Sequence, residues 1–159
     1  MSLPPFQDVL ERHGRDVLRV CAAVAGPANA DDCYQETMLA ALAAYPTLRD
    51  PSVVRSWLLR IASNKAIDAH RARARAPVPV PEPDPGPAPS EGEYDEELWA
   101  RVRELPDKQR LAVAYRFVAD LAYREIGDAM GTSEEAARRN VFEGLRRLRT
   151  VHEAAAATR

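Results

Sequence analysis

A proline-rich segment from Ala76 to Ser90 divides the chain into two parts. Its sequence, APVPVPEPDPGPAPS, holds almost nothing that could form a hydrophobic core. Proline has no backbone N–H donor and a fixed φ, so neither a helix nor a central strand can run through this segment. The segment therefore predicts an extended linker between two domains.

The parts on either side of the linker are short and suit helices. The chain has 159 residues, enough for two small domains. Aromatic residues make up only 6% of it and alanine is abundant, which favours helices over strands. We predict an all-α chain with a first domain over 1–75, a linker over 76–94, a second domain over 95–152 and a tail over 153–159.

Charge is distributed unevenly along the chain. The net charge of -2 looks unfavourable for a protein that binds nucleic acid, but residues 76–97 hold seven acidic and no basic side chains. The regions on both sides are mildly basic, and residues 49–75 carry seven basic against two acidic residues. Such a local excess is suited to phosphate, and a solvated face is the alternative.

Three helices are predicted in the first domain. The first covers Phe6 to Cys21 and stops at Gly26, the second starts near Asp31 and ends before Pro46, and the third runs from about 53 to 75. The third helix has an apolar stripe and a polar face, so one side can pack while the other binds. The stripe comprises Val54, Trp57, Leu58, Ile61, Ala62 and Ile67, with Trp57 expected in the core.

Four helices are predicted in the second domain, over about 95–104, 107–118, 123–130 and from 133 to at least 149. The last two flank a turn with Gly131, the spacing of a helix-turn-helix, although any two short helices around a glycine match this pattern. Thr132 with Glu135, or Ser133 alone, can cap the last helix. Its predicted packing positions are Ala137, Val141, Leu145 and Leu148.

The sequence shows no motif for catalysis, a metal or a membrane. Cys21 and Cys33 lack ligand spacing and are interpreted as reduced, partly buried thiols, and the three histidines are scattered. No apolar run approaches the roughly 20 residues of a membrane span. We expect a cytoplasmic protein that is not an enzyme, with no metal, no cofactor and no membrane insertion.

Two separate motif groups resemble the extracytoplasmic-function (ECF) group of bacterial sigma factors. In the first domain these are DCYQET and SWLLRIASNKAIDAHRAR; in the second they are ELPDKQR, YRFVADLAYREIGDAMGTS and the basic last helix. The resemblance implies sigma region 2 and region 4 domains. It also implies two partners: the RNA polymerase core, through its largest-subunit clamp helices and beta flap, and promoter DNA.

The resemblance assigns polymerase binding to the DCYQET run. Exposed carboxylates and an amide on successive helical turns suit a basic partner helix. Helix-start acids that favour the dipole explain Asp31 and Asp32 without a partner, but explain the next acidic turn less well. The predicted polymerase-binding residues are Asp32, Gln35, Glu36 and Thr37.

The resemblance assigns recognition and melting of the minus-ten element to the third helix. An amide can pair with an exposed base edge, and the basic residues can neutralise the backbone. The preceding loop, Leu48 to Ser52, would capture a flipped base over an apolar pocket. The predicted residues are Arg60, Asn64, Lys65, Asp68, Arg71 and Arg73; a helix cap or an internal salt bridge is the alternative for Asp68.

The last helix is implied to read the minus-thirty-five element in the major groove. The predicted residues are Ser133, Arg138, Arg139, Phe142 and Arg146; solvated charge is an equal alternative for Arg146, Arg147 and Arg149. Thr132, Asn140, Glu134 and Glu135 depart from the family pattern, and Gly127 replaces the usual alanine at a cost of roughly 1 kcal/mol in helix propensity.

The leading function is a sigma factor that directs RNA polymerase core to specific promoters and assists promoter opening. The altered recognition helix suggests an alternative, a polymerase-associated or helix-turn-helix DNA-binding regulator that has lost initiation activity. An anti-sigma factor is a further candidate partner.

Overall fold

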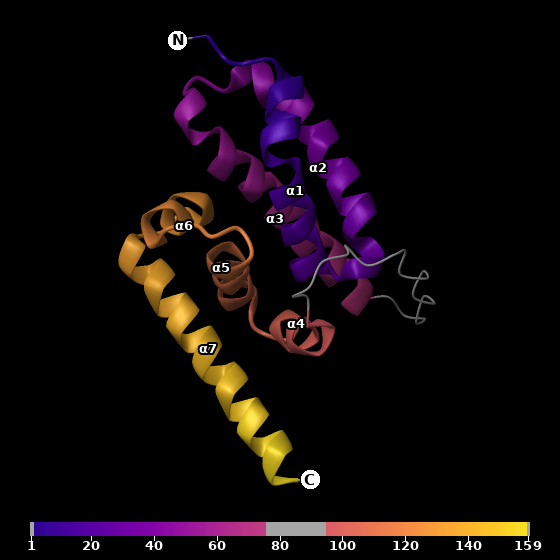
Figure 1. Cartoon of the computed structure of the whole chain (residues 1–159), viewed down its shortest axis with the longest axis vertical. Coiled ribbons are helices and arrows are strands. Elements are labelled where there is room, and N and C mark those ends of the chain that lie inside the picture. Colours follow the sequence, from indigo (N-terminus) through magenta and orange to yellow (C-terminus); the bar gives the residue numbers. More distant parts are fainter. Residues whose placement is uncertain (1, 76–94, 159) are drawn as a thin grey trace. The chain divides into compact units, whose positions relative to one another are not determined.

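The computed structural model describes residues 2–75 and 95–158, and it contains helices and turns but no strand over these residues. The all-α prediction is therefore confirmed. The chain divides into two compact units, Met1–Ser90 and Glu91–Arg159 (Figure 1). The predicted linker, 76–94, lies outside the described residues. No described helix is both long and apolar enough to cross a membrane.

The first unit is a three-helix bundle of α1 (Phe6–Ala25), α2 (Ala30–Ala44) and α3 (Val54–Ala74). Each helix packs against the other two (Figure 1). Gly26 ends α1 at a φ of 94°, a conformation that side chains with a Cβ rarely adopt. Pro27 then opens a short 3-10 turn that leads into α2. The helix boundaries agree with the predicted ones to within a few residues.

The core of this unit differs from the predicted apolar stripe at two positions. Leu58 and Leu59 are fully buried, whereas Trp57 and Ile61 are only half-buried. The Trp57 ring lies 6.3 Å from that of Tyr45 and does not enter the core. The reason is that α3 contacts α1 and α2 at once, so its buried face is wider than a single stripe and is centred differently.

The two cysteines face each other inside the bundle. Cys21 on α1 and Cys33 on α2 are both buried and form no disulfide, as predicted. A hydrogen bond with the Cys33 thiol, together with burial, raises the pKa of Cys21 far above its ordinary value. The Cys21 thiol is therefore protonated, and both buried side chains contribute to packing.

The second unit consists of three short helices against one long helix. These are α4 (Glu96–Arg103), α5 (Asp107–Phe117), α6 (Tyr123–Met130) and α7 (Glu134–Ala157), and α7 contacts each of the others (Figure 1). Residues 153–157 were predicted to belong to a tail, but they are helical, because α7 continues through the alanine run to Ala157. Alanine has the highest helix propensity, which explains the extension.

One part of the core of the second unit lies where α7 closely approaches α5. Val102, Leu105 and Val113 are buried together, with Leu148 of α7 packed against them. Leu145, predicted to pack, is 37% exposed, and its neighbour Gly144 is buried instead. A Cβ at position 144 would lie 2.9 Å from Cγ2 of Val113, so glycine lets α7 approach α5 at this turn.

Candidate partner and nucleic-acid interfaces

One face of α2 carries three of the four residues predicted to bind polymerase. Asp32, Gln35 and Glu36 are exposed, and their spacing of three and four residues aligns them on one side of the helix. Asp32 also lies in the first turn, where the helix dipole favours an acid. Gln35 and Glu36 lie beyond that turn, so the dipole does not explain them.

Thr37 does not share this face, and the prediction that it contacts a partner is wrong. Its side chain is fully buried, and its hydroxyl donates a 2.6 Å hydrogen bond to the backbone carbonyl of Cys33. This bond to the preceding turn satisfies the hydroxyl inside the bundle. Thr37 therefore belongs to the core and acts on the exposed face only by holding α2 in place.

Two exposed leucines extend the α2 face toward its C-terminal end. Leu39 is 69% exposed and Leu42 is 53% exposed. They continue the helical spacing that begins at Asp32, and the sequence analysis missed them because it assigned apolar residues to cores. The available signal was their register: Leu39 follows Gln35 and Glu36 by four and three residues.

A polar and mainly basic face runs along α3, opposite its buried side. Arg60, Asn64, Asp68 and Arg71 are all exposed, at intervals of four, four and three residues. Lys65 is half-buried beside this row, as is Arg73 near the helix end. Position 68 is in the middle of the helix, so Asp68 caps neither end.

The loop before α3 is closed by its own hydrogen bonds. The Asp50 carboxylate accepts from the backbone N–H of Ser52 at 2.9 Å and from its hydroxyl at 2.7 Å. These bonds lower the pKa of Asp50 below its ordinary value. Pro51 follows at the start of a 3-10 turn that leads directly into α3. The second half of the Leu48–Ser52 loop is therefore stiffened.

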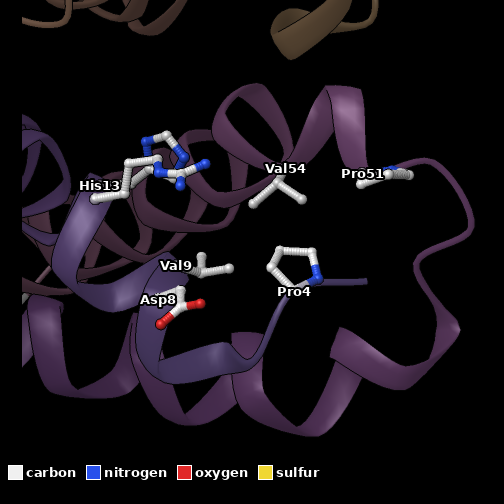
Figure 2. Close-up of a pocket in the computed structure, with 7 residues that line it drawn as sticks. Pro4, Asp8, Val9, His13, Pro51 and Val54 are labelled. Atoms are coloured by element: carbon white, nitrogen blue, oxygen red, sulfur yellow. The ribbon is translucent and has the colours of Figure 1, made fainter. Parts of the chain in front are cut away.

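A small hollow lies beside this loop, between the start of α3 and the N-terminal part of the chain. Figure 2 shows Pro4, Val9 and Val54 gathered around it, with Pro51 at one side and His13 at the other. Asp8 and Arg12 complete its lining. Burial, followed by the nearby guanidinium groups of Arg55 and Arg12, lowers the pKa of His13. The hollow thus has an apolar floor and ionisable groups at its edge.

The turn between α6 and α7 has helix-turn-helix geometry. Gly131 ends α6 in the left-handed region with a φ of 67°. The N–H of Thr132 donates to the carbonyl of Gly127 at 2.8 Å. The Ser133 hydroxyl accepts from the N–H of Ala136 at 3.1 Å, which makes Ser133 the N-cap of α7. Of the two predicted capping arrangements, the structure has Ser133 alone.

Gly127 has a structural role at this turn. A Cβ at this position would lie 2.9 Å from the backbone oxygen of Thr132 and 3.1 Å from the backbone of Ser133. Backbone atoms cannot move aside as a flexible side chain can. Alanine would therefore strain the turn, and the helix propensity lost with glycine is offset by a closer turn.

The exposed face of α7 carries the residues predicted to read DNA. Arg138, Arg139 and Arg146 are exposed, and the Phe142 ring is 67% exposed among them. An exposed phenylalanine on a basic helix face is suited to apolar contact with a thymine methyl group. Ser133 is exposed as well, although its hydroxyl oxygen already accepts the capping bond.

The whole chain is similar to known sigma factors. Residues 9–76 match the Sigma-70 region 2 family and residues 102–150 match the Sigma-70 region 4 family. The chain is 34% identical to the ECF RNA polymerase sigma factor SigD of Mycobacterium tuberculosis, over 91% of this chain and 75% of SigD. The chain belongs to the ECF sigma factor family. It is 26% identical to the sigma factor SigV of Bacillus subtilis, over 86% of this chain and 84% of SigV.

Solved structures share the fold of this ECF sigma factor. The sigma factor RpoE of Bartonella quintana, solved with the anti-sigma factor NepR, matches with a TM-score of 0.75 at 17% identity, covering 93% of this chain and 96% of that one. CnrH, solved with the cytosolic domain of CnrY, matches with a TM-score of 0.72 at 21% identity, covering 94% and 88%. The protein is thus an RNA polymerase sigma factor of transcription initiation, with RNA polymerase and promoter DNA as its partners.

Proposed function

We propose that this sigma factor binds the clamp helices of the polymerase largest subunit through the exposed face of α2. The carboxylates of Asp32 and Glu36 and the amide of Gln35 would pair with basic and polar groups, giving register and rate of association. Leu39 and Leu42 would supply the apolar burial that charge pairs alone do not provide.

Promoter opening is assigned to α3 and the loop before it. Arg60 and Arg71 would neutralise backbone phosphates, while Asn64 between them pairs with the edge of an unstacked base. The observation that carries this proposal is the row of polar side chains on the face of α3 opposite its core. Lys65 and Arg73 are at the side of the row and would add charge without reading bases.

The second unit would read the minus-thirty-five element with α7 in the major groove. Arg138 and Arg139 near the helix start would face base edges, and Phe142 would contact a thymine methyl group. Arg146 would contact a phosphate. Another surface of this unit would contact the polymerase beta flap.

The proposed activity involves no covalent chemistry by this chain. RNA synthesis belongs to the polymerase, and the sigma factor contributes binding free energy that favours open promoter DNA. We further propose a cytoplasmic location and regulation by an anti-sigma factor. The structure of the sigma factor RpoE, solved in complex with the anti-sigma factor NepR, supports this last point.

Run-off transcription tests the proposal directly. Purified full-length protein and core polymerase are incubated with promoter fragments of the source genome, and transcripts are compared with those of core enzyme alone. We expect new transcripts with defined start points from some of the fragments. Binding to polymerase without a transcript from any fragment would instead favour a regulator that has lost initiation activity.

A further inference from the structure

Three helices of the second unit each contribute one side chain to a group centred on the ring of Tyr123. The ring of Tyr123, at the start of α6, has the guanidinium carbon of Arg116 from α5 at 4.9 Å from its centroid. The guanidinium carbon of Arg138 from α7 lies over the same ring, also at 4.9 Å. Both distances are within the range of cation–π attraction.

Arg116 fixes one side of this group to the scaffold. Its Nη1 donates a 3.0 Å hydrogen bond to the backbone carbonyl of Leu121 in the loop before α6. Leu121 is itself only 1% exposed and belongs to the core of the unit. The ring of Tyr123 is therefore held by a side chain that is anchored to buried backbone.

Arg138 is the exposed member of the group, and it contacts the ring. Its side chain is 63% exposed, and its carboxylate partner, Glu134, is at 3.5 Å, a long contact between two exposed groups. Such a pair holds a side chain weakly. The ring of Tyr123 supplies a second contact from a different helix. This contact places the Arg138 guanidinium of α7 over a residue of α6.

The position of the Arg138 guanidinium over a ring suits base reading. When a guanidinium meets a ring with its flat face, its N–H groups stay free to donate in the plane of the group. Paired recognition of guanine O6 and N7 in the major groove uses this same edge. A side chain ordered before binding loses less conformational entropy when it binds.

We propose that Tyr123 is a positioning residue for promoter recognition, holding Arg138 so that its edge reads one guanine of the minus-thirty-five element. The proposal rests on the proposed function of α7 as the reading helix. Arg116 of α5 also contacts the ring and helps to hold it in place. Recognition at this base pair then depends on a residue of α6 that need not touch the base.

The test is a selection experiment with the full-length protein and core polymerase. The template is a fragment transcribed by the wild-type holoenzyme, with its minus-thirty-five segment randomised, and bound DNA is sequenced. Wild type should enrich guanine at one position, and Arg138→Ala should reduce that preference about tenfold. Tyr123→Leu and Tyr123→Met should reduce it about threefold at that position only, while Tyr123→Phe keeps it.

Two controls separate positioning from a loss of structure. The double variant Tyr123→Leu/Arg138→Ala should match Arg138→Ala alone, because the ring acts through the arginine. Arg124→Ala, at the exposed position next to Tyr123 on α6, should leave the guanine preference unchanged. Thermal unfolding followed by Trp99 fluorescence in a Trp57→Phe background checks that the second unit stays folded.

Three results would overturn the proposal, and they differ in what they say about the proposed function. If Arg138→Ala removes the preference and both Tyr123→Leu and Tyr123→Met keep it, α7 reads DNA without help from the ring. If the preference survives Arg138→Ala, another residue reads that base. If wild type selects no sequence in the segment, the proposed reading by α7 fails together with the positioning role.

Discussion

The two units of this sigma factor differ in how their cores relate to their exposed faces. In α3 of the first unit, buried Leu58 and exposed Asn64 lie on different sides of the helix, so packing and binding are separate. In the second unit, the helices meet through Gly127 and Gly144, and exposed Arg138 rests on a ring from another helix. The helical period of the sequence predicts which residues are buried and which are exposed in the first arrangement. It predicts this much less well in the second.

Buried polar groups show the same difference. In the first unit, Thr37 and Ser63 each donate to a carbonyl four residues earlier in their own helix, at 2.6 and 2.8 Å. In the second unit, Arg110 is only 4% exposed, donates to the carbonyl of Leu105 at 3.0 Å and lies 3.3 Å from Asp107. The first set is local to one helix, whereas Arg110 of α5 reaches back to a carbonyl before that helix begins.

The largest expected effect is the loss of a buried leucine from the first unit. Leu58→Ala should destabilise this unit by about 2–5 kcal/mol, because it removes transfer free energy and leaves a cavity. Urea unfolding can be followed separately in the two units in single-tryptophan backgrounds, Trp99→Phe for the first unit, which holds Trp57, and Trp57→Phe for the second, which holds Trp99. Exposed Leu42→Ala is the control and should change stability by less than about 0.5 kcal/mol.

The same experiment shows whether the two units unfold independently. If Leu58→Ala also shifts the Trp99 transition, the two units do not unfold independently. A loss no larger than that of the Leu42 control would mean that the bundle repacks easily around this position.

Substitution of Gly127 in α6 tests the close packing of the second unit. Gly127→Ala gains roughly 1 kcal/mol of helix propensity but forces a Cβ against backbone atoms, and overpacking typically costs about 1–3 kcal/mol. We expect a net loss, measured by urea unfolding of the Trp99 transition. Exposed Asp128→Ala, next in α6, should show no such loss. A stabilised Gly127→Ala protein would show that the turn can relax.

The exposed α2 face should act independently of the bundle core. Glu36→Ala and Leu39→Ala should each weaken binding to core polymerase by about tenfold, equivalent to about 1.4 kcal/mol, without changing the Trp57 unfolding transition. Equilibrium binding of labelled protein to core enzyme measures the effect. Glu11→Ala, an exposed acid on α1, is the matched control; equal weakening by that variant would point to general charge attraction.

Asn64 tests whether the exposed face of α3 acts in promoter opening. Asn64→Ala should leave polymerase binding intact and slow promoter opening several-fold, because one amide pairing with an unstacked base is lost, typically worth about 1 kcal/mol. Permanganate footprinting of unpaired thymines over time measures opening. Ser56→Ala, nearer the start of α3, provides a comparison, and footprints identical to wild type would remove Asn64 from the proposed site.

The smallest expected effect is a pH dependence confined to the first unit. Burial, then Arg55 and Arg12, lowers the pKa of His13 below its ordinary 6.5, while Asp16 opposes this. The folded state thus favours the neutral ring, and this contribution is lost as pH falls from the unfolded pKa through the folded one.

The Trp57 transition should therefore weaken between about pH 7.5 and about pH 5.5, and His13→Gln should make that dependence shallower. His152→Gln, at an exposed position of α7, should not alter it. An unchanged slope in His13→Gln would assign the dependence to other groups.

Helix positions and the division into two helical parts could be predicted because they follow from local signals. Gly26, Pro27 and Gly131 stop helices through their own backbone preferences, and each observed helix lies close to its predicted range. The exposed sides of α2 and α3 could also be predicted for most residues. Asp32, Gln35 and Asn64 are exposed as their helical spacing indicates.

The errors occur where a residue's environment depends on two neighbouring helices. Thr37 was assigned to the binding face, but a bond to the preceding carbonyl lets a hydroxyl enter the core. Trp57 and Leu145 lie at the edge of packed faces, because α3 contacts two helices and α7 approaches α5 through Gly144. A period of 3.6 residues cannot indicate how wide a buried face is.

The helices and the family could be predicted from the sequence, since these depend on local conformation and motif order. Which side chains of a helix face are accessible, and which support one another, depends on how the helices pack in the tertiary structure. The Tyr123 contact with Arg138 is the clearest case: the two residues are fifteen positions apart on different helices. The turn between α6 and α7, packed closely against Gly127, brings them together. No local backbone preference acts over fifteen residues.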